Sequence, residues 1–375
     1  MKKLLFTKLL LLGLCLGLVS CSSDDDDNNN NANGNQYEDT PYSQLTPGQK
    51  KEKLNEDAVA FFTEMNGLSS SKALDALQSF YSLCAEYGAP ELSNSPAAGK
   101  DIMTINDFYG KYTFNAESEE WIKSASANQL VLSFPLNKTS NSEIIVTGVS
   151  SNVVNGEIQL PKELNAKISI DGTQVGAIEL KANLTSLESI PSSANVKFTF
   201  DEYTLAMDAN KGNINTASTK LTKGSKVLLN GKADLTANLD NLSDENVKGG
   251  NIEIDLMDRL AIAGKVDFSS LTKEESKLQE ESEYDHDSKE YVEALAKIYN
   301  KYYNLDLVSK TDGTKIAKVI FIAAPYEEGV AYSYYDEVLA LQFDDNTIIE
   351  ASVFFGSGFD KATKAASDFR DKFFN

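Results

Sequence analysis

The feature that most constrains the fold is an alternation of apolar and polar residues between about residues 100 and 270. Apolar residues take every second position in two long runs: Val227, Leu229, Gly231, Ala233, Leu235, Ala237 and Leu239, then Leu260, Ile262, Gly264, Val266 and Phe268. Lys, Thr, Asn, Ser and Asp fill many of the positions between them. Because successive side chains of a strand point to opposite faces, the pattern predicts long antiparallel strands with one apolar face and one wet face.

Turn and register signals divide this region into hairpins. The dipeptides Asp171-Gly172 and Asp312-Gly313 predict two turns. The apolar phase slips by one residue after Ala177, and again between Phe200 and Tyr203. Each slip predicts a β-bulge, which bends a strand.

A period of three to four residues predicts helices on both sides of the strand region. One begins at Pro47, and a second runs from a Ser71 cap to Gly88. Cys84 lies on the apolar stripe of the second helix and is interpreted as a core residue. Helical pattern returns in a charged segment that begins near Lys273. After a hairpin of residues 338–343 with 348–355, a last amphipathic helix uses apolar residues between 359 and 373.

These elements predict an α+β fold: a long curved antiparallel β-meander packed on helices, with an N-terminal helix pair and a C-terminal helix–hairpin–helix unit. The expected divisions are N-terminal helices over residues 46–99, a β-rich region over 100–270 and an α+β region over 271–375. Residues 46–375 are expected to form one or two compact units.

The first twenty residues have the pattern of an export signal. Lys2, Lys3 and Lys8 give a positive start, and an apolar run of residues 9–19 follows, too short for a permanent membrane span. The next residues, Leu18-Val19-Ser20-Cys21, resemble the lipobox of bacterial lipoproteins. The resemblance implies that residues 1–20 are a signal peptide, that cleavage precedes Cys21, and that acyl chains on Cys21 hold the protein on a membrane. An ordinary secretory signal that contains a cysteine is the alternative.

An acidic run, Asp24 to Asp27, and four asparagines follow the cysteine. The run resembles the signal that sends some Gram-negative lipoproteins to the outer face of the outer membrane, so the expected location is the outer membrane, exposed at the cell surface. The alternative is a solvated spacer, because a block of like charge repels itself. Residues 21–45 are expected to be the lipid anchor and a disordered tether spanning about 25–30 Å.

Charge and cysteine content exclude some classes of protein. The chain has 35 basic and 56 acidic residues, a formal charge of −21, and the signal peptide removes only basic charge. So acidic a surface argues against nucleic acid as a partner. Of three cysteines, Cys15 leaves with the signal and Cys21 is acylated, so only Cys84 remains and no intrachain disulfide is expected.

No motif for catalysis, metal binding or a cofactor is recognisable. The only histidine, His286, stands in Tyr284-Asp285-His286-Asp287 without a second soft ligand, and is interpreted as a surface helix residue. No nucleophile elbow, dinucleotide fingerprint or phosphate-binding loop is present. The prediction is therefore no catalytic residue, no metal and no cofactor, and an enzyme is disfavoured. A pair of carboxylates could still hydrolyse a glycoside without a local signature.

Tyrosine is concentrated near the C-terminal end of the chain. Nine of 16 tyrosines fall between Tyr284 and Tyr335, and the loop at 325–335 contains four of them: Tyr326, Tyr332, Tyr334 and Tyr335. Tyrosine rings in a loop can stack on sugars or hold a partner protein, or they can simply cover the core at a sheet edge. The sequence therefore favours a non-catalytic binding or structural module for a glycan or a partner protein. The alternatives are a carrier of an apolar ligand, with small residues such as Gly231 and Gly264 making room for it, and a carboxylate-based glycoside hydrolase.

Overall fold

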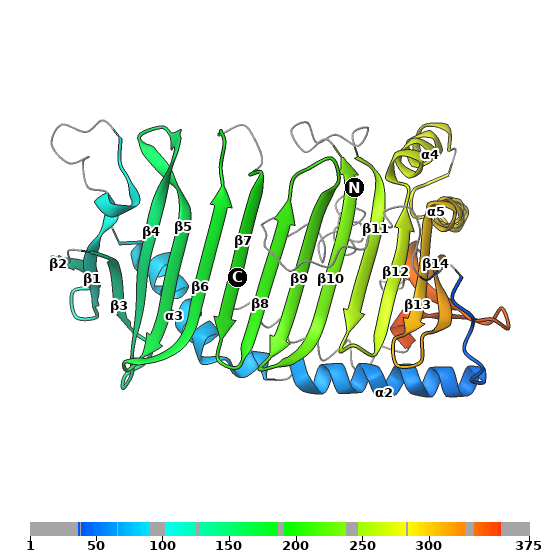
Figure 1. Ribbon diagram of the computed structural model, residues 1–375, viewed down its shortest axis with the longest axis horizontal. Coiled ribbons are helices and arrows are strands. Elements are labelled where there is room, and N and C mark those ends of the chain that lie inside the picture. Colours follow the sequence, from blue (N-terminus) through cyan, green and yellow to red (C-terminus); the bar gives the residue numbers. More distant parts are fainter. Residues whose placement is uncertain are drawn as a thin grey trace.

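A computed structural model of the chain describes residues 37, 39–65, 67–90, 102–124, 128–186, 191–237, 247–282, 284–326 and 334–353. They form an α+β protein built on one 16-stranded sheet (Figure 1). From β3 to β16 every strand pairs antiparallel with the next one along the chain, as the predicted meander requires. At the other edge, β1 pairs parallel with β3 and antiparallel with β2.

The first eight strands are β1 (Gly110–Asn115), β2 (Glu120–Ser124), β3 (Leu130–Pro135), β4 (Asn141–Asn155), β5 (Ile158–Ile170), β6 (Thr173–Asn183), β7 (Ser193–Phe200) and β8 (Tyr203–Asn210). The other eight are β9 (Asn215–Lys223), β10 (Lys226–Ala237), β11 (Val247–Leu256), β12 (Leu260–Val266), β13 (Tyr303–Ser309), β14 (Thr314–Tyr326), β15 (Tyr334–Gln342) and β16 (Ile348–Glu350). The α-helices are α2 (Pro47–Met65), α3 (Lys72–Tyr87), α4 (Phe268–Glu281) and α5 (Lys289–Tyr302), and the short 3₁₀ helices cover Leu68–Ser70 and Ile105–Phe108.

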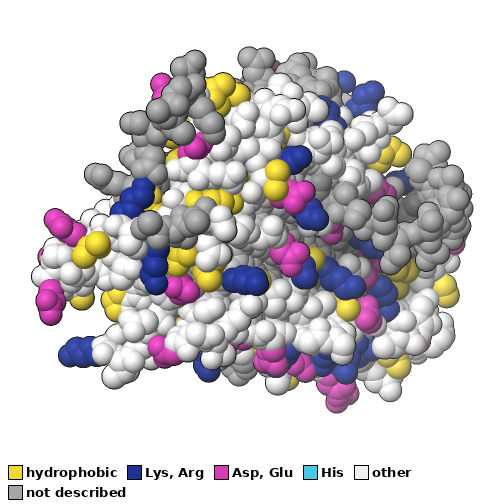
Figure 2. All heavy atoms as spheres, turned by 60° about the vertical axis from the view of Figure 1, so that its left-hand side comes forward, with side chains coloured by type: hydrophobic (Ala, Val, Ile, Leu, Met, Phe, Trp, Pro, Cys, Tyr) yellow, Lys and Arg dark blue, Asp and Glu magenta, His cyan; other side chains and the backbone are white. Residues whose placement is uncertain are grey.

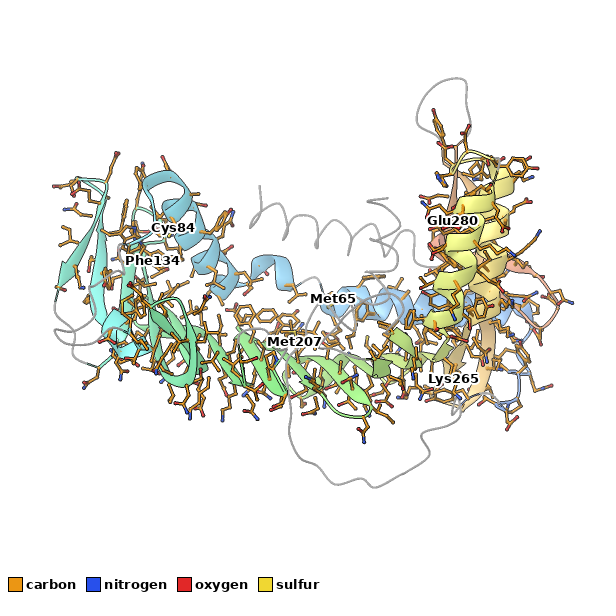
Figure 3. All side chains as sticks on the ribbon, turned by 90° about the horizontal axis from the view of Figure 1, so that it is seen from above. Met65, Cys84, Phe134, Met207, Lys265 and Glu280 are labelled. Carbon is orange, nitrogen blue, oxygen red and sulfur yellow. The ribbon has the colours of Figure 1, made fainter. Side chains whose placement is uncertain are left out.

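Seen from above, α3 rises at one end of the sheet and α4 and α5 rise at the other, all on the same side (Figure 3). Helix α2 begins at Pro47, and Ser71 caps α3 by accepting a hydrogen bond from Leu74 N–H. On the face seen in Figure 2, acidic and basic side chains are interspersed, and hydrophobic ones are scattered between them. The amphipathic strands therefore bury one face against helices and core and leave the other wet.

Two of the predicted turns have the expected backbone. Asp171 and Gly172 join β5 and β6 with φ values of 48° and 78°, the left-handed region that a two-residue hairpin uses. The β13–β14 turn has Gly313 at φ 67°. The slip between Phe200 and Tyr203 is not the predicted bulge, and that prediction is wrong. These two residues face each other across a tight turn in which Asp201 has φ 52°, and the turn itself reverses the apolar phase.

The bulge predicted in β6 is present, but slightly earlier than the apolar pattern placed it. Ile168 faces Gly176 while Ser169 faces Gln174, which leaves Val175 as the extra residue. The helical region near Lys273 is two helices rather than one charged segment, with residues 282–288 between them. The strand predicted over 348–355 ends at Glu350, and residues 351–353 are helical. The predicted last helix lies outside the described residues.

A bulge that the alternation concealed occurs in β10. Val227 faces Thr222 and Leu229 faces Leu221, so Leu228 is the additional residue. The alternation put Leu228 on the wet face, yet it is fully buried, in a cluster with Phe200 and Tyr203. The extra residue shifts the side-chain phase, which brings a leucine to the core without interrupting the strand.

Helix α2 runs along the ends of the strands, across a row of hairpin turns (Figure 1). Lys50 Nζ binds Asp344 at 2.6 Å in the β15–β16 turn, and Asp57 binds Arg259 at 3.0 Å in the β11–β12 turn. Glu64 pairs with Lys226 at 2.6 Å beside the β9–β10 turn. Between the first two, Lys53 Nζ donates to Thr311 Oγ1 at 3.4 Å in the β13–β14 turn, so polar contacts of α2 reach four hairpins along one edge of the sheet.

The segment before α2 is ordered against the sheet. Ser43 N–H donates to Lys315 O, and Lys315 N–H donates to Pro41 O, each at 2.8 Å. The ring of Tyr42 lies 5.9 Å from Lys50 Nζ and 5.5 Å from Lys315 Nζ, a cation–π position on two sides. The C-terminal end of the predicted tether, residues 21–45, is therefore not disordered, because these contacts fix it to β14.

Candidate functional site

The candidate site is a solvent-open groove between α4 and α5, with a volume of about 560 Å³. Three carboxylates line it, from Glu274 and Glu281 on α4 and Glu290 on α5, with Lys277 as a basic neighbour. Tyr284 and Tyr291 supply aromatic surface, and Ser282, Leu278, Ala294 and Ile298 complete the lining. Acids outnumber bases here, so the groove favours neutral or cationic ligands over anionic ones.

Side-chain caps fix the two helices that form the groove. Asp267 accepts a hydrogen bond from Ser270 N–H at the start of α4, and Ser288 accepts one from Tyr291 N–H at the start of α5. Each cap satisfies a backbone donor that the first helical turn leaves free. Ser282 and Tyr284, from the connection between the two helices, also line the groove.

The wall formed by Glu274 is held rigidly. Its carboxylate binds Lys301 and accepts a hydrogen bond from Tyr302 Oη at 2.7 Å. These hydrogen bonds, from Lys301 first and Tyr302 second, lower the pKa of Glu274, and the same contact raises the pKa of Lys301 to about 12. Glu274 is therefore a fixed, ionised acceptor on the groove wall.

Only part of the tyrosine-rich loop lies within the described residues. Tyr332 and the side chain of Tyr326 lie outside the described residues. Tyr334 is exposed, whereas Tyr335, the next residue of β15, packs against the C-terminal core. Adjacent residues of a strand point to opposite faces, so the two rings cannot share one binding surface.

The start of β15 lies next to the connection between α4 and α5. Tyr335 N–H donates to Asp287 O at 2.9 Å, which places the start of β15 beside residues 282–288. His286 lies in this exposed connection, not on a helix face as predicted, with its ring 4.7 Å from that of Tyr291 in an edge-to-face arrangement. Tyr284, which is 59% exposed, was not selected from the sequence. Ser282 follows the last residue of α4 and Ser288 precedes the first residue of α5. These two serines were the sequence signal that could have predicted the break between the helices.

Buried tyrosine and glutamate side chains lie beneath the groove. Tyr291, Tyr299 and Tyr303 belong to the C-terminal core cluster, and their pKa values are raised by burial first and then by nearby acids. The acids are Glu275 of α4 and Glu337 of β15, both buried. Neither lines the groove, so the described residues do not present this pair to a substrate as a glycosidase requires.

The small residues proposed for an apolar cavity are explained by close packing. A Cβ atom on Gly264 would lie 1.9 Å from Asn304 O on the neighbouring strand, and one on Gly231 would lie 3.0 Å from Thr219 Cγ2. Ala233 is buried within the C-terminal core. These positions are small because strands and side chains approach them, so they do not favour the apolar carrier.

The other predicted residues add no second site. Cys21 lies outside the described residues. Cys84 is a half-buried free thiol on α3, and burial raises its pKa, which keeps it in the less reactive protonated form. In the described ranges no group of three His, Cys, Asp or Glu side chains could hold a metal ion. No helix in those ranges has the length and apolarity needed to cross a membrane.

Comparison with known proteins gives no further guide, because no family model, no curated protein and no solved structure matches this chain. The function has to be argued from the groove itself.

Proposed function

We propose that this protein is a lipoprotein, held on the outer membrane by acyl chains on Cys21 and exposed at the cell surface, whose folded body binds a neutral glycan in the groove between α4 and α5. The lipobox Leu18-Val19-Ser20-Cys21 supports the anchor, and the acidic run Asp24 to Asp27 supports surface exposure. A partner protein with a neutral or basic surface is the second ligand class that this groove would accept.

The observation that carries the binding proposal is the lining of the groove. The exposed ring of Tyr284 offers flat apolar surface, which suits the C–H face of a sugar, while Tyr291, the other lining tyrosine, is only 5% exposed. The carboxylates of Glu274, Glu281 and Glu290 accept hydrogen bonds from hydroxyl groups, and Ser282 can donate as well as accept. Aromatic surface beside several carboxylate acceptors is the combination that a neutral oligosaccharide needs.

The test of binding uses an array of neutral, sialylated and sulfated glycans, followed by titration calorimetry on any hit. Tyr284→Ala should weaken binding of a neutral glycan about fivefold or more, because one stacked ring contributes about 1 kcal/mol or more. Tyr81→Ala on α3 is the matched control, since this tyrosine is 47% exposed and far from the groove. Binding only of sulfated or sialylated glycans, or equal loss in both variants, would contradict the proposal.

The anchor is tested separately. Cys21→Ala should accumulate unprocessed precursor and abolish incorporation of labelled fatty acid. Replacing Asp24 to Asp27 with alanines should protect the protein from protease added to intact cells. Normal lipid labelling of the Cys21 variant would contradict the anchor, and unchanged protease sensitivity of the alanine variant would show that the acidic run is only a spacer.

We also retain the proposal that residues 359–373 form an amphipathic helix that completes a C-terminal helix–hairpin–helix unit. Their apolar residues recur at helical spacing: Phe359, Ala362, Ala365, Ala366, Phe369 and Phe373.

A further inference from the structure

A row of alanines crosses the apolar face of the middle strands. Each alanine lies directly opposite the next one on the neighbouring strand: Ala182 of β6, Ala194 of β7, Ala209 of β8, Ala217 of β9 and Ala233 of β10. Directly paired residues share one face of a sheet, so these five small side chains form a continuous strip across the strands. This alanine row would let the backbone of a partner lying across the strands come close to the sheet.

The core clusters beneath the described helices meet the alanine row only at Ala233, which belongs to the C-terminal core. On β7 and β8 the cluster beneath α2 and α3 extends only to Phe198 and Leu205. Farther along these strands, Ala194 is 4% exposed and Met207 is 8% exposed, and neither belongs to a core cluster. Figure 3 shows Met207 in the middle of the sheet, between α3 at one end and α4 and α5 at the other. Burial at these positions indicates a cover other than the described helices.

A buried polar side chain lies beside the row. Thr219 of β9 is 5% exposed and lies directly opposite Met207 on one side and Gly231 on the other. Its hydroxyl group forms no hydrogen bond with the described residues. Because a buried hydroxyl normally has a partner, a polar group of whatever covers this face should reach it.

Residues 359–373 have a surface that complements the row. As a helix, they carry one apolar stripe at spacings of three and four residues: Phe359, Ala362, Ala366, Phe369 and Phe373. Alanines in the middle of the stripe allow close approach to the alanine row, and Thr363 flanks the stripe with a hydroxyl group. Such a helix is about 22 Å long, close to the roughly 19 Å between the first and last of five strands.

We propose that residues 359–373 dock as a helix across the alanine row, so that a segment of the same chain closes the apolar face between α3 and α5. This docking rests on the helix proposed above for these residues. The described chain reaches Val353 beyond β16, the edge strand on the β10 side of the row. Phe359 therefore lies nearer β10 and Phe373 nearer β6. The docked segment takes the place on this face that an apolar ligand would occupy.

The experiment is hydrogen exchange of the full folded chain, measured as protection factors for the amides of residues 359–373. A free helix of this length is marginal in water, so strong protection of the segment requires docking. Ala366→Lys puts a charge in the middle of the apolar stripe and should lower protection of the segment by at least about tenfold. Asp368→Lys introduces the same side chain on the opposite face of the helix and should behave as wild type.

A second pair of variants tests the sheet side of the contact. Ala217→Trp fills the middle of the alanine row and should lower protection of residues 359–373 while α5 stays protected. Lys220→Trp places the same side chain on the exposed face of the same strand and should leave the segment protected.

Three results would overturn the docking. A segment that is protected in the wild type and equally protected in Ala217→Trp would leave the helix standing and contradict only its place on the row. A segment without protection in the wild type would contradict the helix as well. Protection that rises with protein concentration would assign the apolar face to a second copy of the chain. Glycan binding in the groove between α4 and α5 is a separate measurement, and its absence would not affect the docking.

Discussion

The helices α2 and α4–α5 are attached to the same sheet in two different ways. Helix α2 lies across strand ends, where its charged residues reach hairpin turns: Lys50 to Asp344, Asp57 to Arg259 and Glu64 to Lys226. The α4–α5 pair lies on the apolar side of the C-terminal strands and is held mainly by burial of side chains such as Leu271 and Leu295. Helix α2 also buries Leu54, Ala58 and Phe62, so its charged contacts to the hairpin turns add to apolar burial, whereas the α4–α5 pair depends mainly on burial.

The two attachments should differ in whether salt or pH changes their contribution to stability. Pairs at the surface are screened by salt and contribute little each, whereas apolar burial is insensitive to salt. The α4–α5 region, however, covers the buried Glu337, whose pKa burial raises to about 7. The two attachments should therefore respond to different perturbations, and the following four experiments test this separation.

The largest effect is expected from truncation of the apolar attachment. Leu295 of α5 is 1% exposed within the C-terminal core. Leu295→Ala should lower the free energy of unfolding by about 2–5 kcal/mol, measured by urea denaturation, because it removes buried methyl groups and leaves a cavity. Val59→Ala on α2, where Val59 is 52% exposed, should change it by less than about 0.5 kcal/mol. Similar losses in both variants would mean that α5 is not held by burial.

The second-largest effect is expected on the pH dependence of the stability of the fold. The pKa of Glu337 is about 7 in the folded protein and 4.5 for the ordinary group, so folding binds its proton more tightly. Its stabilising contribution is complete below pH 4.5 and is lost as pH rises through about 7, a change of about 3 kcal/mol at most. The difference in urea midpoint between wild type and Glu337→Gln should follow this curve. A constant difference from pH 4 to pH 8 would contradict the assignment.

Substitutions in the charged attachment of α2 should lower stability less, and the loss should depend on which partner of the ion pair is replaced. Lys50 is fully buried and Asp344 is 39% exposed. Asp344→Ala should cost about 2 kcal/mol, less than the roughly 3–5 kcal/mol for a fully buried pair, because it leaves Lys50 buried without its carboxylate. Adding Lys50→Met should restore part of the stability. If the double variant is less stable than Asp344→Ala alone, the pair is not the reason for the loss.

The smallest effect is expected at the other end of α2. Glu64 pairs with Lys223 and Lys226, and these contacts lower its pKa, Lys226 first. Glu64→Gln should lower the melting temperature slightly at low salt, and the difference from wild type should disappear at about 0.5 M sodium chloride through screening. A loss that persists in high salt would assign it to packing of the side chain rather than to its charge.

The parts of the fold that could be predicted depend on local patterns. Pro47, the Ser71 cap and Asp171-Gly172 act through backbone geometry within a few residues, and each has the predicted structure. Leu228 could not be placed, because its burial depends on a bulge relative to β9 that alternation within β10 does not encode. The turn at Asp201 was missed because an aspartate in the left-handed region has no glycine beside it to mark the hairpin.

The candidate site was predictable only in outline. The concentration of tyrosine overlaps the part of the chain that forms the groove, but the groove depends on α4 and α5 being separate helices that meet side by side. Tyr284 enters it from the connection between them, while Tyr335 is directed into the core by its place on β15. Which of two neighbouring tyrosines is exposed follows from register, and register follows from pairing with β14.

The chain-order pairing of the sheet has a consequence for how this protein unfolds. From β3 to β16 each strand contacts mainly the strands before and after it, so the sheet resembles a one-dimensional array whose units are coupled only to nearest neighbours. Such an array can fray from its ends, one hairpin at a time, instead of melting in one step. Helix α2 couples the β9–β10, β11–β12 and β15–β16 hairpins at once. Cooperativity of the transition should therefore come from this single helix more than from the strands it spans.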